Sequence, residues 1–169
     1  MVPKRDFRRQ YKTLLLVGEG ETEEAFLKHV KALYAPQGCG LKVKVMCARG
    51  KGAAHVVDFA IRQRRVIAYD TVAALFDTDT DWGERVARRA REHGIHVLLS
   101  DPMFEAMMLR VCRKAVEGSA KELKGQFALL VCGDGLDPKN YNANFGGNVL
   151  QGARQRERTL DQLLQLLRQ

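Results

Sequence analysis

Acidic side chains gather at three places in the chain, each directly after an apolar run. The three groups are Glu19, Glu21, Glu23 and Glu24 in "LLLVGEGETEE"; Asp77, Asp79 and Asp81 in "ALFDTDTD"; and Asp101 and Glu105, with Ser100, in "LLSDPMFE". Carboxylates repel one another and repel a bare phosphate, but their oxygens are the ligands that Mg²⁺ and Mn²⁺ prefer. The sequence therefore predicts a divalent-metal site that meets phosphate through the metal.

A structural explanation of the same residues stays open. Acidic side chains in the first turn of a helix complement its dipole, and Ser100 or Asp101 could be a helix N-cap. Taken singly, Glu21, Glu24 and Asp101 fit this explanation better than a metal site. The coincidence of three acidic groups, each at the end of an apolar run, favours the metal.

Four other phosphate or metal patterns fail on specific residues. In the dinucleotide fingerprint Glu23 stands in place of the third glycine, and "RGKGAA" lacks the first glycine and the hydroxyl of a Walker A loop. An EF-hand loop needs glycine where Trp82 stands and glutamate where Arg88 stands. The haloacid-dehalogenase pattern needs a small hydroxyl or aliphatic residue in place of Asp81.

Apolar strands alternate with amphipathic helices over the first two thirds of the chain. The periodicity predicts strands at 12–17, 41–47, 71–77 and 95–100, and helices at 22–34, 53–67, 84–93 and 102–115. Such alternation implies right-handed crossovers, hence an α/β, Rossmann-like, mostly parallel sheet of about four strands with helices on both faces. Ligands of these sheets lie beyond the carboxyl ends of the strands, where the acidic groups fall.

The pattern weakens after about residue 117. We expect a helix at 120–131, then the loop "GDGLDPKNYNANFGGN", then a last helix. The last helix carries a leucine stripe, which indicates core packing or a dimer seam, from Leu160, Leu163, Leu164 and Leu167. The predicted organisation is a core at 1–116 and a helical C-terminal extension at 117–169 packed on it, in a single domain.

The chain is basic, with a formal net charge of +8. Positive side chains cluster in "KRDFRR" near the start and in two helical segments, as Arg62, Arg64, Arg65, Arg85, Arg88 and Arg89. A basic surface attracts polyanions, of which nucleic acid is the commonest in cells. Composition leaves two readings open, a nucleic-acid surface and a set of solvated helix faces.

Export is not expected. The longest apolar runs are too short to cross a bilayer or to serve as a signal-peptide core. Cys39, Cys47, Cys112 and Cys132 show no metal-binding or disulfide spacing. We therefore expect a cytoplasmic protein with reduced thiols and no membrane partner.

The order strand–"GEGETE"–helix, strand–"FDTD", strand–"SDPMFE"–helix resembles the Toprim domain, and within it the RloB-like group, which is related to the OLD-family nucleases. The resemblance covers residues 14–109, and the last third matches loosely through "KNYNANF". It implies a Toprim fold in which Mg²⁺ is bound by residues matching Glu19, Asp77 and Asp79. It also implies a second acidic position at Glu23, an S-x-P-x-F-E segment with Ser100 and Glu105, and a downstream lysine at Lys139.

The resemblance implies a Mg²⁺- or Mn²⁺-dependent nuclease that hydrolyses phosphodiesters, acting as an accessory factor in restriction or phage defence. A separate ATPase or restriction subunit and a homodimer are among the partners it suggests, because this chain carries no evident ATPase domain. The main alternative is a non-catalytic DNA- or RNA-binding regulatory module on the same scaffold. A third is a phosphotransferase or primase-like activity. DNA and RNA remain equally open as partners.

Overall fold

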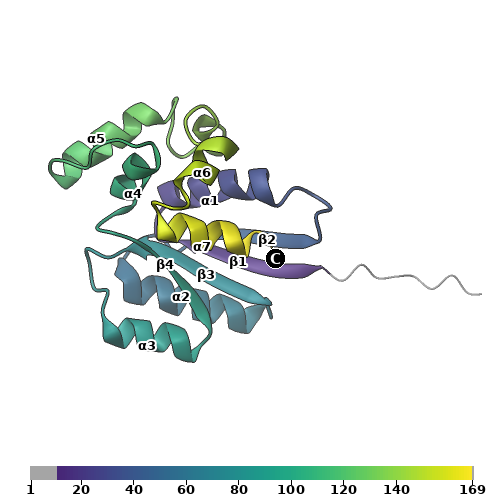
Figure 1. The fold of residues 1–169 in the computed structure, drawn as a ribbon. Coiled ribbons are helices and arrows are strands. Elements are labelled where there is room, and N and C mark those ends of the chain that lie inside the picture. The colour runs from purple at the N-terminus through teal and green to yellow at the C-terminus, as the bar shows by residue number, and fades with distance from the viewer. Residues whose placement is uncertain (1–10, 169) are drawn as a thin grey trace, which may run out of the picture.

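A computed structural model describes residues 11–168, so the "KRDFRR" cluster lies outside the described residues. At its centre is a parallel sheet of β1 (Lys12–Gly18), β2 (Leu41–Cys47), β3 (Thr71–Asp77) and β4 (Ile95–Ser100), in the order β2-β1-β3-β4 (Figure 1). The predicted parallel α/β sheet of four strands is confirmed.

Burial explains where each strand sits. Four consecutive residues of β1, Leu14 to Val17, and five of β3, Val72 to Phe76, are buried, as expected of central strands covered on both faces. The edge strand β2 instead alternates, with Val43 buried and its neighbours Lys42 and Lys44 exposed. The two central strands therefore form the rigid frame to which the flanking segments attach.

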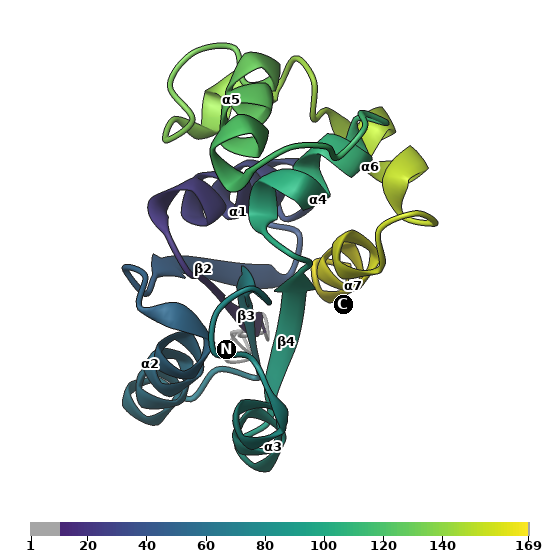
Figure 2. The same cartoon turned by 90° about the vertical axis from the view of Figure 1, so that its left-hand side faces the viewer.

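Helices cover both faces of the sheet. One face carries α1 (Glu21–Tyr34), and the other carries α2 (Gly52–Val66) and α3 (Glu84–Glu92) (Figure 2). Alternate residues of β1 serve the two layers: Leu14 packs with the α1 side, and Leu15 packs with the α2 side. This arrangement also confirms the expectation of helices on both faces.

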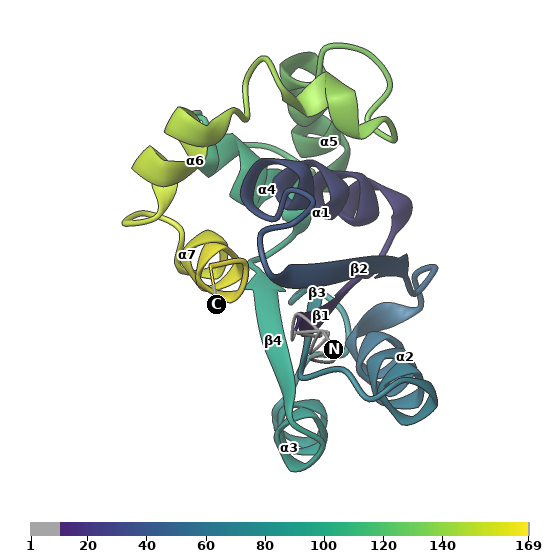
Figure 3. The same ribbon diagram turned by 90° about the vertical axis from the view of Figure 1, so that its right-hand side faces the viewer.

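The C-terminal third packs beside α1, away from α2 and α3 (Figure 3). Its elements are α5 (Ala120–Leu130), the 3-10 helix η1 (Pro138–Tyr141), α6 (Gly147–Ala153) and α7 (Arg158–Leu166), and they pack with α4 (Phe104–Val111), the helix that follows β4. An aromatic cluster joins them to α1: the ring of Phe26 lies 5.6 Å from that of Phe104 and 6.0 Å from that of Tyr141, between ring centres. The leucine stripe of α7 is buried in the same core.

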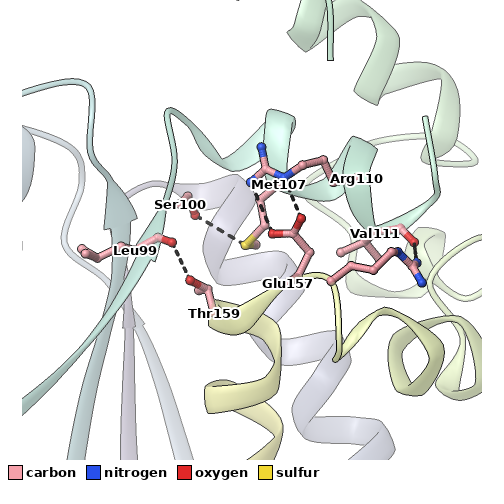
Figure 4. Close-up of polar contacts among 8 residues, drawn as sticks. Leu99, Ser100, Met107, Arg110, Val111, Glu157 and Thr159 are labelled. Atoms are coloured by element: carbon pink, nitrogen blue, oxygen red, sulfur yellow. Dashed lines mark hydrogen bonds and ion pairs between the residues drawn. The ribbon is translucent and has the colours of Figure 1, made fainter. Parts of the chain in front are cut away.

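Polar contacts fasten α7 to β4 and α4 (Figure 4). The Thr159 hydroxyl donates to the Leu99 carbonyl at 2.6 Å, and Arg110 forms a salt bridge with Glu157 at 2.6 Å. The Glu157 side chain is only 8% exposed, so this ion pair is largely shielded from water. The position of α4 is therefore fixed by the extension as well as by the sheet.

Two expectations about this region were wrong. The helix after β4 begins at Phe104 and ends at Val111, whereas the pattern predicted 102–115; Pro102 lies in the preceding bend, and Arg113 takes a left-handed φ of 57° that ends the helix. The predicted loop also contains η1 and the start of α6. Apolar burial of Tyr141 and Phe145 orders this segment despite its glycines and asparagines.

Among residues 11–168, every helix is too short or too polar to traverse a lipid bilayer.

Candidate metal centre

The carboxyl ends of three strands meet at one edge of the sheet. Gly18 pairs with Leu75 across β1 and β3, and Asp77 pairs with Ser100 across β3 and β4. The chain leaves β1 towards β2 on one side and returns to β3 on the other, so the strand order reverses between β1 and β3. Such a switch point is where parallel sheets bind ligands, and Glu19 and Asp77 lie at it.

Glu19 is held firmly at this edge. Its backbone N–H donates to the Leu75 carbonyl at 3.0 Å, and its own carbonyl accepts from the Gly50 N–H at 2.7 Å. Its side-chain Oε2 accepts from the Asp77 N–H at 3.0 Å. The carboxylate of Glu19 is thus tied to the end of the neighbouring strand.

Glu23 faces the same edge from the first turn of α1. Its Oε2 accepts from the Gly20 N–H at 3.0 Å, and the residue is buried. A Cβ at Gly20 would lie 2.9 Å from that oxygen, and a Cβ at Gly18 would lie 2.9 Å from the Glu24 nitrogen. Gly18 is therefore required for α1 to start this close to the strand ends, and a side chain at Gly20 would displace the Glu23 carboxylate.

The electrostatics show that the acidic side chains act on one another. The pKa of Glu23 is raised to about 7. Its burial is the largest cause, and the charges of Glu105 and then Glu19 add to it. The pKa of Asp77 is raised to about 8. Its burial is again the largest cause, followed by the charges of Glu23, Glu19 and Asp79. Carboxylates from β1, α1, β3 and α4 therefore contribute to one region of negative potential.

The donor set of this region fits a divalent cation. Every candidate ligand is a carboxylate oxygen, and Asp77 Oδ1 is buried without a hydrogen-bond partner among the described residues. A buried, unpaired carboxylate oxygen is costly unless an ion or donor satisfies it. Yet, within residues 11–168, no three acidic, cysteine or histidine side chains stand in a metal-binding arrangement. Glu19 and Glu23 are instead turned onto backbone N–H groups, so side-chain rotation is needed to close around an ion.

The remaining acidic candidates have other contacts. Asp81 Oδ1 accepts from the Ala53 N–H at 2.6 Å, which caps α2, and Asp101 Oδ1 accepts from the Thr78 hydroxyl at 2.7 Å. Glu24 pairs with Lys28 at 3.0 Å. Glu21 and Asp79 are exposed. Of this group, Asp79 alone is among the charges that raise the pKa of Asp77.

Ser100 is fully buried, at 0% exposure. Its hydroxyl points towards the sulfur of Met107, 3.8 Å away, as Figure 4 shows. This contact joins the end of β4 to α4, the helix that carries Glu105. Ser100 thus supports the edge of the site rather than offering an open ligand.

The candidate arginines divide into engaged and exposed side chains. Arg64 donates to the carbonyls of His93 and Gly94 at 2.9 and 2.8 Å, and Arg89 pairs with Asp58 at 2.5 Å. Arg62 and Arg65 on α2 and Arg85 and Arg88 on α3 are exposed. Between α2 and α3 lies a cavity of about 380 Å³ lined by Arg85, Arg88 and Arg89. Lys139, in η1, is exposed too.

Tyr141 is a neighbour of the site that the sequence did not indicate. The residue is fully buried, its hydroxyl donates to the Gly135 carbonyl at 2.8 Å, and its ring stacks on His29 with centres 5.8 Å apart. Burial and then the charges of Glu23 and Glu105 raise the pKa of its phenol, so the negative potential of the carboxylates extends to Tyr141. The loose match of "KNYNANF", which contains Tyr141, was the one sequence signal in this segment, and it did not indicate where the tyrosine lies.

Comparison with known proteins adds little to this geometry. No family model and no curated protein matches the chain. Among solved structures, the chain is similar to the C-terminal region of the Burkholderia pseudomallei OLD protein, with 15% identity over 92% of this chain and 88% of that chain and a TM-score of 0.40. A similarity at this TM-score carries no argument about the site.

Proposed function

We propose that the chain is a Mg²⁺- or Mn²⁺-dependent nuclease that hydrolyses nucleic-acid phosphodiesters. One observation carries the proposal: carboxylates from four separate segments create a negative potential at the point where the strand order reverses. They belong to Glu19, Glu23, Asp77 and Glu105, and among the described residues Asp77 Oδ1 is buried without a hydrogen-bond partner. Uncompensated repulsion of this kind destabilises the fold. A cation at this edge would remove it.

Each of the five acidic residues has a distinct place in this proposal. Glu19, Asp77 and Asp79 would hold one ion, and Glu23 with Glu105 a second. When bound, such ions lower the pKa of a coordinated water and neutralise charge on the phosphate. Gly20 keeps Glu23 at the edge, and the backbone N–H of Asp77 orients Glu19. These contacts hold Glu19 and Glu23 at the strand ends, and both side chains would rotate from the N–H groups to close around an ion.

The substrate would be held by its phosphates. The exposed arginines of α2 and α3, together with Lys139, are the residues proposed to contact the nucleic-acid backbone. Arg64 and Arg89 are less suited, because both already bind partners within the chain. Contacts to phosphate alone position a strand without reading its sequence, so either DNA or RNA would satisfy this surface.

A cleavage screen tests the proposal. Purified protein is incubated with end-labelled single- and double-stranded DNA and RNA, with Mg²⁺, with Mn²⁺ or with EDTA. The matched control is Glu19→Gln, which keeps an acceptor oxygen for the Asp77 N–H but removes the charge. We expect cleavage of at least one polymer by wild type with metal, and none by the variant or in EDTA.

A non-catalytic nucleic-acid-binding module is the second candidate. The observation that favours it is that Glu19 and Glu23 are hydrogen-bonded to backbone N–H groups and that no three acidic, cysteine or histidine side chains within residues 11–168 are arranged to hold an ion. Tight binding of one polymer without cleavage in any metal would replace the nuclease by this module.

The wider biological setting is part of the proposal. The motif resemblance supports four further parts of the proposal. These are membership of the RloB-like group of Toprim proteins, a role in restriction or phage defence, a cytoplasmic location, and assembly with a separate ATPase subunit or as a homodimer. Co-purification from the native host, followed by an ATPase assay of any partner, tests the assembly.

A further inference from the structure

A second, basic cavity lies at the far end of α4 from Glu105. It has a volume of about 460 Å³, within the range of small-ligand sites, and lies among the ends of α4 and α5 and the first turns of α6. Its lining includes the cations Arg113, Lys114 and Arg156, and no aspartate or glutamate. Glu105 and Cys112 are seven positions apart, so the two sites are separated by about 10 Å of helix.

The three cations lack acidic partners. No carboxylate of residues 11–168 lies within salt-bridge distance of Arg113, Lys114 or Arg156. Arg156 is fixed by two carbonyls, donating to Gly152 at 2.7 Å and to Val111 at 3.0 Å, which orients its guanidinium without neutralising it. Charge that is positioned but not compensated favours an anion.

Helix capping accounts for only part of this charge. Arg156 caps α4 by donating to the carbonyl of Val111, its last residue, whereas the carbonyls of Leu109 and Arg110 accept from the backbone N–H groups of Lys114 at 2.9 Å and Arg113 at 3.0 Å, so these two side chains are not used for capping there. Arg113 also occupies a left-handed φ of 57°, where glycine would be less strained. The side chain of Arg113 lines the cavity from this strained backbone position.

The rest of the lining suits a nucleotide rather than a simple anion. Val111, Leu130 and Val149 provide an apolar wall, and the amides of Asn144 and Asn148 stand beside it. We propose that this cavity binds one nucleotide unit, with Arg113, Lys114 and Arg156 on its phosphate and the apolar wall against its base. The unit is either a free mononucleotide or one residue of a nucleic-acid strand.

A binding experiment in EDTA tests this site independently of cleavage. The affinity of a labelled eight-nucleotide deoxythymidine strand is measured by fluorescence polarisation at several salt concentrations. The test variant is Arg113→Gly/Lys114→Ala, in which glycine also relieves the left-handed backbone. The matched control is Lys121→Ala/Lys124→Ala, which removes equal charge from exposed positions of α5.

We expect the test variant to lose affinity and to flatten the log–log salt slope by about 1.4 units, about 0.7 for each lost contact to a single strand. The control should keep the wild-type slope. If millimolar AMP displaces the strand and adenosine does not, the site is assigned to a free nucleotide. If the test variant loses affinity but AMP does not displace the strand, the site is assigned to the strand. Equal changes in both variants would overturn the proposal.

Cys112 gives a second readout, since it lines the cavity and Cys39 does not. Wild type is treated with iodoacetamide in EDTA, with and without AMP or the strand, and peptide masses give each rate. An occupant of the cavity should slow alkylation of Cys112 and leave that of Cys39 unchanged. If neither ligand protects Cys112, the cavity is not a nucleotide site. Since no metal is present, this failure would leave the proposed nuclease activity untouched.

Discussion

The carboxylate of Glu19 accepts a hydrogen bond from the backbone N–H of Asp77, at 3.0 Å, across the ends of β1 and β3. This contact joins the two strands at the point where their order reverses, and it holds two acidic side chains next to each other. Asp77 Oδ1 remains buried and unpaired among the described residues. The unpaired oxygen lowers the stability of the metal-free protein, and in the proposed function a cation would satisfy it.

Metal should stabilise wild type more than Asp77→Asn. The variant removes a charge that neighbouring carboxylates repel, so its metal-free melting temperature at pH 8 should exceed that of wild type. A gain of one kcal/mol corresponds to about 2–4 °C for a chain of this size. Millimolar Mg²⁺ or Mn²⁺ should then raise the melting temperature of wild type and hardly affect that of the variant. Equal shifts in differential scanning calorimetry would contradict a metal site at Asp77.

The stability of the metal-free protein should fall as pH rises from about 5 to 8. The pKa values of Glu23 and Asp77 in the folded chain are raised to about 7 and about 8, above their ordinary values, so the folded state holds these protons more tightly than the unfolded state. Their contribution is fully present at low pH and is lost as pH passes through 7 and 8. Urea unfolding in EDTA measures this. The slope should be shallower in Asp77→Asn, and a flat wild-type profile would refute the raised pKa values.

Asp79→Asn should separate binding from cleavage. Asp79 is exposed and lies beyond the end of β3, so its replacement should leave the fold and the distant arginines unaffected. Loss of a preorganised charge next to the reacting phosphate costs on the order of 10²-fold or more in rate. Polarisation and gel assays on the same preparation should show unchanged affinity and lost cleavage. Asp101→Asn is a matched control, since its carboxylate contacts the Thr78 hydroxyl instead.

Replacing Arg85 and Arg88 with alanine should weaken nucleic-acid binding in a salt-dependent way. Both are exposed and line the cavity between α2 and α3. The log–log salt slope should flatten by about one unit per lost phosphate contact. Arg91→Ala serves as the control, because Arg91 pairs with Glu84 at 2.6 Å on the same helix. Binding that ignores salt, or an unchanged slope, would leave these arginines as solvated surface.

The sheet could be predicted from the sequence because its strands are defined locally. Four apolar runs of suitable length, separated by amphipathic segments, leave few arrangements other than a parallel sheet. The start of α4 could not be predicted in the same way. Proline is common in the first turn of a helix, but here Pro102 lies in a bend and Met103 is extended. The helix starts at Phe104, which is fully buried beside Phe26.

The candidate site was predictable to the level of strand ends and no further. The acidic groups after β1 and β3 lie at one edge because the carboxyl ends of parallel strands must do so. Asp81 belongs to the same "DTDTD" run, yet its carboxylate caps α2, a contact between residues 28 apart in sequence that no local pattern indicates. Tyr141 reaches the carboxylates only through the packing of η1 against α1.

The helix α4 carries Glu105 in its first turn and Arg110 in its last, and Arg110 is bound to Glu157 at the start of α7. Because eight residues of helix move as one rigid piece, a displacement of α7 displaces the carboxylate of Glu105. The C-terminal third thus helps to fix the position of an acidic side chain, although it contributes none itself to the candidate metal centre. A chain cut near residue 116 would keep all four strands and all five proposed metal ligands, but Glu105 would lose the anchor that sets its distance from Glu23.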